Sequence, residues 1–308
     1  MLSDDEQDGR GALDEQAAQG PLDEPAGNGA LDEHAVLAKL SWGLCSEAGD
    51  IRPHNEDFAG AYAPTIPDDA WDRGPLWVVA DGMGGHAAGE VASRLAVDAL
   101  LSKWSEGVAD APANALRAGV RHANVAVHDA SLETGRRGMG TTVTALTLAG
   151  RDAVIANVGD SRTYVVRRDQ CNQLTTDHSR VSELLRMKLI TPEQAADHPA
   201  RSMLTRSLGS DMIVQVDLVK EPIEAGDTFV LCSDGLWDVV SRPDIAEVAS
   251  AIGSDDVPTP RDAARRLVST AIKRGTADNV TAIVVRITSD RPIPAAGPRR
   301  SFFRRGRS

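Results

Sequence analysis

The chain has 308 residues, with 33 Lys and Arg against 45 Asp and Glu, a formal net charge of -12 and 42% hydrophobic residues, which is typical of a globular protein. Its apolar runs fall far short of the roughly 20 residues that a membrane-spanning helix needs, and its acidic start lacks the features of a secretory signal, so the sequence predicts a cytoplasmic protein without a transmembrane segment. The three cysteines, Cys45, Cys171 and Cys232, form no CxxC pair, which excludes a disulfide scaffold and a zinc finger.

An acidic arm occupies residues 1–38, where ten acids and one base give a net charge of -9. It repeats Leu-Asp-Glu at 13–15, 22–24 and 31–33, and it has few large apolar residues. Such a segment cannot bury enough surface to offset the entropy lost on ordering, so we predict that it is disordered. A solubilising arm and a binding or autoregulatory arm are both compatible with this composition.

The body, residues 39–290, mixes short β-branched runs with longer amphipathic ones and contains no obvious linker. In chain order the patterns predict a strand at 76–80, helices at 89–104 and 113–130, strands at 141–148, 153–158 and 162–167, helices at 181–188 and 193–196, a strand at 228–232, helices at 245–252 and 261–274, and a strand at 279–287. Strands bracketed by helices indicate sheets covered by helices, a mixed class.

A basic tail follows at residues 291–308, where six arginines and no acid give a net charge of +6. It is predicted to be disordered. Arginines flank Phe302 and Phe303, a combination that suits an acidic membrane surface, nucleic acid or the acidic arm. A solvated tail without a partner fits equally well.

Acidic residues recur where the predicted strands end or begin. Asp81, Asp160, Asp234 and Asp278 each stand in such a turn, and a further pair, Glu56 and Asp57, stands in the segment RPHNED. Each one alone is explained by the preference of Asp for tight turns. As a set they suggest something else, because strand ends can gather carboxylates from remote positions at one rim of a sheet.

Carboxylates brought together in this way repel one another unless a cation neutralises them. Oxygen ligands without nearby thiolates or paired imidazoles favour hard cations such as magnesium or manganese. Two such ions flanking a water would produce a nucleophile at neutral pH and stabilise an in-line displacement at phosphorus.

Seven segments, in this order and spacing, resemble the metal-dependent serine/threonine protein phosphatases of the 2C type. They are RPHNED (52–57), VVADGMGGHAAGEVAS (78–93), GMGTTVTAL (138–146), NVGDSRTYVV (157–166), LTTDHS (174–179), LCSDGLWDVVS (231–241) and ADNVTAIVV (277–285). The resemblance covers about residues 40–288, and the DGMGGH stretch is similar to the bacterial branch.

The resemblance implies an α+β fold, a four-layer sandwich of two antiparallel β-sheets flanked by α-helices, with two divalent cations, Mn or Mg, at one end. Asp81 resembles the bridging ligand and Gly82 the residue that lends its carbonyl. Asp234 and Asp278 resemble the other direct ligands, and Glu56 and Asp57 resemble outer ligands that act through water. Asp160 resembles a ligand of the third cation found in bacterial members.

Arg52 stands where the family places the arginine that grips the substrate phosphate, a role that suits the planar donor fork of guanidinium. A surface salt bridge is the alternative. The general acid is less defined, because Met83 occupies the place where many eukaryotic members carry a histidine. His86 is one candidate, although it could instead be a packed residue at a helix start, and His54 is another. Water on the metal could replace both.

Residues 177–210 resemble the mobile flap of bacterial members beside the metal site. Its arginines at 180, 201 and 206 suit a surface that receives a phosphopeptide, or are simply solvated in a helical hairpin.

The predicted function is hydrolysis of phosphoserine and phosphothreonine on proteins by a metal-activated water, opposing a bacterial Ser/Thr kinase, by a monomer that does not bind nucleic acid. Two alternatives stay open. One is a catalytically silent module that binds phosphoproteins. The other is a two-metal nucleotide or nucleic-acid phosphoesterase, which the net charge of -9 on the body disfavours, because that charge repels a polyanion.

Overall fold

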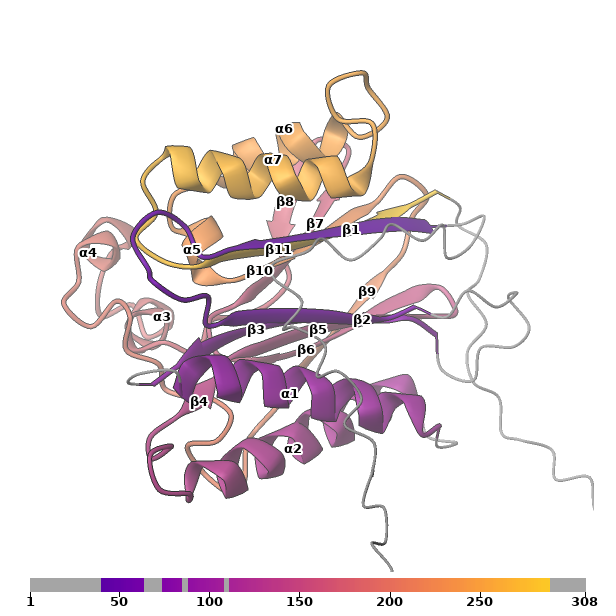
Figure 1. The fold of residues 1–308 in the computed structure, drawn as a ribbon. Helices are drawn as coiled ribbons and strands as arrows, with labels where there is room; N and C mark the ends of the chain where they lie inside the picture. Colours follow the sequence, from indigo (N-terminus) through magenta and orange to yellow (C-terminus); the bar gives the residue numbers. More distant parts are fainter. Residues whose placement is uncertain (1–39, 64–73, 85–87, 108–110, 289–308) are drawn as a thin grey trace, which may run out of the picture.

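The computed structural model describes residues 40–63, 74–84, 88–107 and 111–288. The predicted arm and tail therefore lie outside the described residues, and so does His86. Two antiparallel sheets stack face to face, and a pair of helices covers each outer face (Figure 1). This confirms the predicted four-layer α+β sandwich.

One sheet has five strands in the order β1-β11-β10-β7-β8. Their bounds are Leu40–Glu47 (β1), Val280–Ile287 (β11), Thr228–Cys232 (β10), Arg162–Arg167 (β7) and Gln170–Gln173 (β8). Helices α6 (Arg242–Ser250) and α7 (Pro260–Lys273) cover its outer face, and the short α5 (Asp234–Trp237) follows β10 directly.

The second sheet runs in the order β2-β3-β5-β6-β9, and β4 also pairs with β3. Its strands are Asp57–Tyr62 (β2), Leu76–Met83 (β3), Gly140–Thr141 (β4), Val143–Ala149 (β5), Asp152–Val158 (β6) and Asp217–Pro222 (β9). Helices α1 (Ala88–Ser105) and α2 (Pro112–Ser131) cover it. The helices α3 (Arg180–Arg186) and α4 (Pro192–Ala196) lie between β8 and β9 in the chain.

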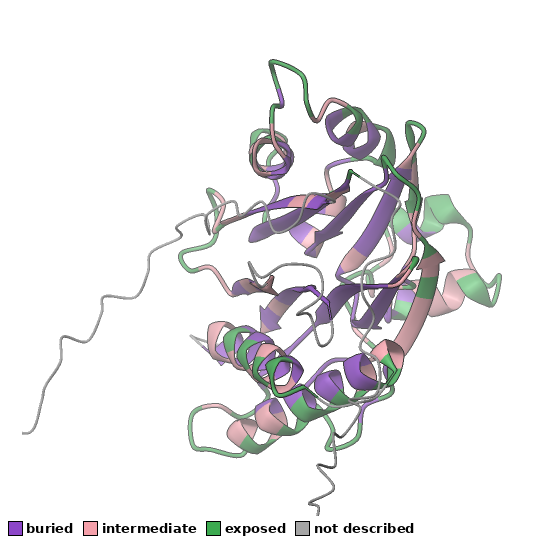
Figure 2. Ribbon diagram, turned by 90° about the vertical axis from the view of Figure 1, so that its right-hand side faces the viewer, coloured by how far each residue is buried: buried purple, intermediate pink, exposed green. Residues whose placement is uncertain are grey.

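Four layers require three apolar interfaces. Successive side chains of a strand point to opposite faces of the sheet, so each strand can contribute to two of these interfaces. In β3, Leu76, Val78 and Ala80 face α1 and α2, whereas Trp77 and Val79 face the other sheet. A third cluster packs β7, β10 and β11 against α6 and α7. Central strands are thus buried on both faces, which explains why they are continuous apolar runs in the sequence; Figure 2 shows the buried residues filling both sheets and the inward faces of the helices.

All six predicted helices and all six predicted strand regions are present, whereas the sequence patterns did not indicate β1, β2, β8, β9 and α5. The missed strands interleave apolar residues with small, polar or charged ones, and each lies at the edge of its sheet, where it pairs with one neighbouring strand only. The single strand expected at 141–148 is divided at Thr142 into β4 and β5. Among the described residues no helix combines the length and apolar character needed to cross a bilayer.

Candidate metal centre

The acidic residues singled out in the sequence gather at one end of the sandwich. Asp57 opens β2 and lies directly opposite Asp81 in β3. Asp234 opens α5 after β10, Asp278 precedes β11, and Asp160 lies between β6 and β7. The expectation of a tight turn at Asp81-Gly82 is wrong, because β3 continues to Met83 and pairs Gly82 with Thr141 of β4.

The pKa values of these carboxyls are raised by burial and by the charges of their neighbours. Burial, followed by the charges of Asp234, Asp57 and Asp160, holds the pKa of Asp81 well above its ordinary value. Burial raises the pKa of Asp57 to about 7, with the charges of Asp234 and Asp278 adding to the rise. Burial and the neighbouring charge of Asp234 likewise raise the pKa of Asp160 to about 7. A buried group of mutually repelling carboxylates is costly without a compensating cation.

Two buried carboxylate oxygens lack a hydrogen-bond partner among the described residues. They are Oδ1 of Asp57 and Oδ1 of Asp234. The other oxygen of Asp57 accepts a hydrogen bond from the Ser233 hydroxyl at 2.6 Å, so only one side of this carboxylate is satisfied. An unpartnered buried oxygen costs about 1–3 kcal/mol or more, and a hard cation would satisfy both oxygens.

The described side chains do not by themselves complete a cage. Within the ranges that the structure describes, no three His, Cys, Asp or Glu side chains converge closely enough to hold an ion. Magnesium and manganese commonly take backbone carbonyls and waters beside one or two carboxylates. The donor set at this end of the sandwich fits such cations when carbonyls and water supply the remaining ligands.

Two close backbone approaches bring the acidic segments together. The Gly82 N–H donates to the Glu56 carbonyl at 3.1 Å, and a Cβ on Gly82 would lie 2.1 Å from the Gly89 oxygen. A Cβ on Gly235 would lie 2.0 Å from the carbonyl oxygen of Asn279. Only glycine permits either contact, so the two Asp-Gly pairs set the spacing of the site as well as supplying carboxylates.

Asn279, predicted from the sequence only as the start of a strand, positions neighbouring segments through its side-chain amide. Its side-chain oxygen accepts from the Glu56 N–H at 2.8 Å, and its amide nitrogen donates to the carbonyls of Ala48 and His54, each at 2.9 Å. It is 4% exposed. The signal available in the sequence was a polar amide directly after Asp278, at the point where an apolar strand begins.

Arg52 lies beside the predicted metal ligands. Its Nη2 donates to Oδ2 of Asp278 at 2.8 Å, and its Nε donates to the Ala277 carbonyl at 3.2 Å. The side chains of this ion pair are 47% and 38% exposed, and a pair so accessible to water contributes little to stability. The guanidinium is therefore held at the site while remaining available to an incoming anion.

Comparison with known proteins settles the family. The sequence matches the model of protein phosphatase 2C over residues 65–268. The chain belongs to the protein phosphatase 2C family. Serine/threonine phosphatase stp of Listeria innocua is 38% identical over 245 residues, which cover 78% of this chain and 93% of that protein.

Solved structures agree with this assignment. The crystal structure of the Mycobacterium tuberculosis serine/threonine phosphatase PstP/Ppp is 37% identical with a TM-score of 0.70, and the match covers 82% of this chain and all of that chain. A structure of the PstP catalytic domain in complex with two manganese ions is 35% identical with a TM-score of 0.69, covering 82% and 99%. Divalent-cation dependence is thus a property of the family to which this chain belongs.

Three arginines of the segment predicted as the flap of this phosphatase form ion pairs. Arg180 pairs with Glu183 at 3.5 Å within α3, and Arg206 pairs with Asp217 of β9 at 2.7 Å. Arg201 pairs with Asp238, four residues after Asp234. The last pair ties the segment to the α5 end of the metal centre, and the segment lies at the same end of the sandwich as α5 (Figure 1).

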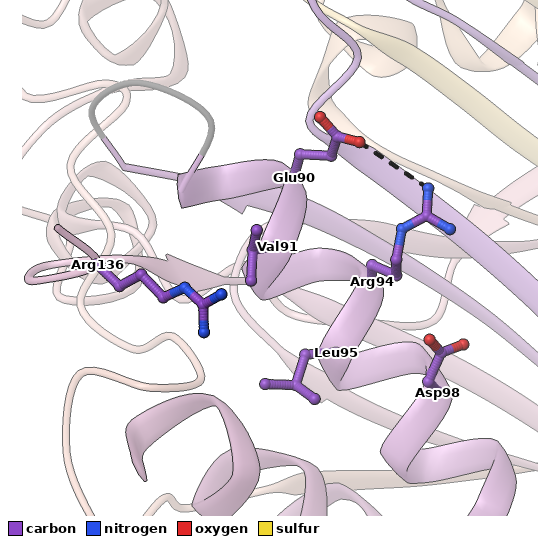
Figure 3. A pocket seen from close by; sticks show the side chains of 6 residues that line it. All are labelled: Glu90, Val91, Arg94, Leu95, Asp98 and Arg136. Carbon is purple, nitrogen blue, oxygen red and sulfur yellow. Dashed lines mark ion pairs between the residues drawn. The ribbon is translucent and has the colours of Figure 1, made fainter. Parts of the chain in front are cut away.

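A separate cavity of about 260 Å³ lies along α1. Figure 3 shows the six side chains that line it: Glu90, Val91, Arg94, Leu95, Asp98 and Arg136. None of them is a predicted site residue, and Glu90 and Arg94 form an ion pair across 3.9 Å. The carboxylate cluster, not this cavity, is therefore the candidate active site.

Proposed function

We propose that this phosphatase hydrolyses phosphoserine and phosphothreonine in proteins at the carboxylate cluster, without a covalent enzyme intermediate. The observation that carries the proposal is the placement of Asp57, Asp81, Asp160 and Asp234 at one end of the sandwich, where their charges raise the pKa of Asp81. Asp57 and Asp234 each have an unpartnered buried oxygen, and the half-exposed Arg52 lies beside them. Net reaction adds water to phosphorus and releases the serine or threonine alcohol and phosphate.

The roles that we propose follow the positions of the residues. Asp81, Asp234 and Asp278 would hold two divalent cations together with the Gly82 carbonyl, with Glu56 and Asp57 as outer ligands and Asp160 at a third cation. When bound, such cations supply Lewis acidity and lower the pKa of water. Manganese is the metal that we would test first, because a related structure contains it.

Arg52 would orient the phosphate. It offers a planar fork of donors that matches two phosphate oxygens, and its pair with Asp278 places that fork at the rim of the cluster. Proton delivery to the leaving alcohol is assigned to His86, with His54 as the alternative. Cytoplasmic location, a Ser/Thr kinase partner and a monomeric state stay predictions from the sequence.

The experiment replaces one carboxylate of the cluster by an amide of nearly the same volume. We expect Asp81→Asn and Asp234→Asn to lose nearly all manganese-dependent hydrolysis of p-nitrophenyl phosphate and of a phosphothreonine peptide, and EDTA to abolish the activity of the wild-type protein. Asp256→Asn, at an exposed loop position, is the matched control and should keep full activity. Undiminished turnover in both Asp81→Asn and Asp234→Asn would refute the assignment.

The alternatives give different results. A silent binding module would retain phosphopeptide without turnover in any divalent cation. A nucleic-acid phosphoesterase would bind polynucleotide in a filter assay with an affinity that falls steeply as salt rises.

A further inference from the structure

His178 is a buried histidine in hydrogen-bond contact with the turn that carries Asp160. It is 4% exposed. Its Nδ1 accepts a hydrogen bond from the Gly159 N–H at 3.0 Å, and its own backbone N–H donates to the Gly159 carbonyl at 2.9 Å. One residue therefore holds both backbone polar groups of Gly159, the immediate neighbour of Asp160.

The contacts of Nε2, on the opposite side of the His178 ring, indicate which ring nitrogen carries the proton. Nε2 lies 3.1 Å from Oδ2 of Asp217, and Arg206 donates to the other oxygen of that carboxylate at 2.7 Å. Burial lowers the pKa of His178, so the ring is neutral at pH 7. Nη1 of Arg206 also lies 3.1 Å from Nε2, but its shorter contact is the hydrogen bond to Asp217. Because Nδ1 accepts a hydrogen bond, we place the single ring proton on Nε2, where it is donated to Asp217.

The turn has little freedom to compensate if this contact is lost. Gly159 has a φ of +104°, and a Cβ there would lie 2.6 Å from the Thr142 side chain. On the other side, the Asp160 carbonyl accepts from the Trp237 Nε1–H at 3.0 Å. Asp160 is thus fixed between a histidine at the flap base and a tryptophan of α5.

We propose that His178 is a positioning residue, whose Nδ1 holds the Gly159–Asp160 turn so that the Asp160 carboxylate faces the cation site. This inference rests on the proposed function of the cluster. Partners that orient ligands without touching the metal typically change metal affinity 10–100-fold when mutated. Asp217 acts one step further out, by accepting the Nε2 proton and so leaving the Nδ1 lone pair for Gly159, and Arg206 holds Asp217 in place.

Two substitutions of His178 test the contacts of its two ring nitrogens separately. In His178→Asn the amide oxygen takes the place of Nδ1 and can still accept from Gly159, but it does not reach Asp217. In His178→Gln the amide reaches towards Asp217 and the acceptor for Gly159 is lost. His198→Gln is the matched control, because His198 also accepts a backbone N–H through Nδ1, that of Ala200 at 3.1 Å, within the same segment.

Manganese binding is measured by titration calorimetry and by the EPR signal of free Mn²⁺. We expect His178→Gln to weaken binding at the weakest site about tenfold, with His178→Asn and His198→Gln within about twofold of the wild-type protein. The manganese dependence of kcat should shift with the binding, while KM for the phosphopeptide stays unchanged. Equal losses in the Asn and Gln variants, or none in either, would overturn the proposal.

A nitrogen NMR spectrum of the wild-type protein tests the same idea without relying on the folding of a variant. The His178 signals, assigned by their absence from the His178→Asn spectrum or by sequential connectivity, should show a protonated Nε2 and an unprotonated Nδ1. The opposite tautomer would refute the Gly159 contact. Wild-type protein that binds no manganese and hydrolyses no phosphopeptide would instead refute the proposed function.

Discussion

Replacing Asp57 by asparagine should stabilise the cation-free protein and weaken the response of the protein to manganese. Asp57 is buried, one of its oxygens has no partner among the described residues, and the other accepts from Ser233. Asparagine has nearly the same shape and can still accept the Ser233 hydrogen bond, so the substitution removes the charge and little else.

The magnitude follows from the pKa of Asp57, which rises from 3.8 to about 7 on folding. At about 1.4 kcal/mol for each pKa unit, ionised Asp57 lowers the free energy of unfolding by at most about 4 kcal/mol. Some of this is shared with the neighbouring carboxylates, and asparagine loses the charge-assisted part of the Ser233 hydrogen bond, about 1–2 kcal/mol. We therefore expect a net gain of about 2 kcal/mol.

The gain should depend on pH in a defined direction. Between pH 3.8 and about 7 the folded protein binds more protons at Asp57 than the unfolded chain does, so its stability falls as the pH rises through this range. The penalty is complete above pH 7 and shrinks towards pH 4. The advantage of Asp57→Asn in EDTA should accordingly be larger at pH 8 than at pH 5.

Urea unfolding followed by circular dichroism measures these differences. We expect Asp57→Asn to be more stable than the wild-type protein in EDTA at pH 8 and to gain less from added manganese, with Asp256→Asn unchanged in both conditions. Equal or lower stability of Asp57→Asn in EDTA at pH 8 would show that the carboxylates do not repel one another as argued.

Three further substitutions test the packing and the anion site. Gly235→Ala should cost most of the manganese-dependent activity, because its Cβ would lie 2.0 Å from the Asn279 carbonyl and push the Asp234 and Asp278 segments apart; activity equal to that of the wild-type protein would contradict this. Phe229→Ala should lower the free energy of unfolding by about 3–5 kcal/mol in urea titrations, because Phe229 is fully buried between the sheets; a loss below 1 kcal/mol would be inconsistent with that packing. Arg52→Lys should raise KM for a phosphopeptide several-fold, since lysine retains the charge but not the two-pronged donor geometry; an unchanged KM would remove Arg52 from phosphate binding.

Much of the fold could be predicted because the central strands and the helices carry strong local patterns. The run Leu76 to Ala80 is apolar on both faces since it lies between two covered surfaces, and Thr191-Pro192 marks a helix start that the structure realises as a capping box. Edge strands such as β8 and β9 carry no such pattern. Their pairing is determined by partners that are distant in the chain.

The candidate site was predictable in its composition but not in its geometry. The recurrence of Asp at strand ends predicts Asp81, Asp160 and Asp234 as ligands, which stays a prediction, and the ordered motifs identified the family. The roles of Asn279, Ser233 and His178 were missed, because each is an ordinary polar residue in the sequence and acquires its role only through hydrogen bonds to segments remote in the chain.

The sequence by itself determined the chemistry that this protein can support: oxygen-rich acidic turns, an arginine four residues before Glu56, and glycines where backbones must meet. The tertiary structure alone decided which of these residues lie next to one another and how much free energy their burial and repulsion cost. Asp57 and Asp81 are ordinary acids until β2 and β3 pair in register, which buries Asp57 and places the two carboxylates opposite each other. Burial and mutual repulsion depend on the distances between residues and on the exclusion of water, and the order of residues along the chain specifies neither of these directly.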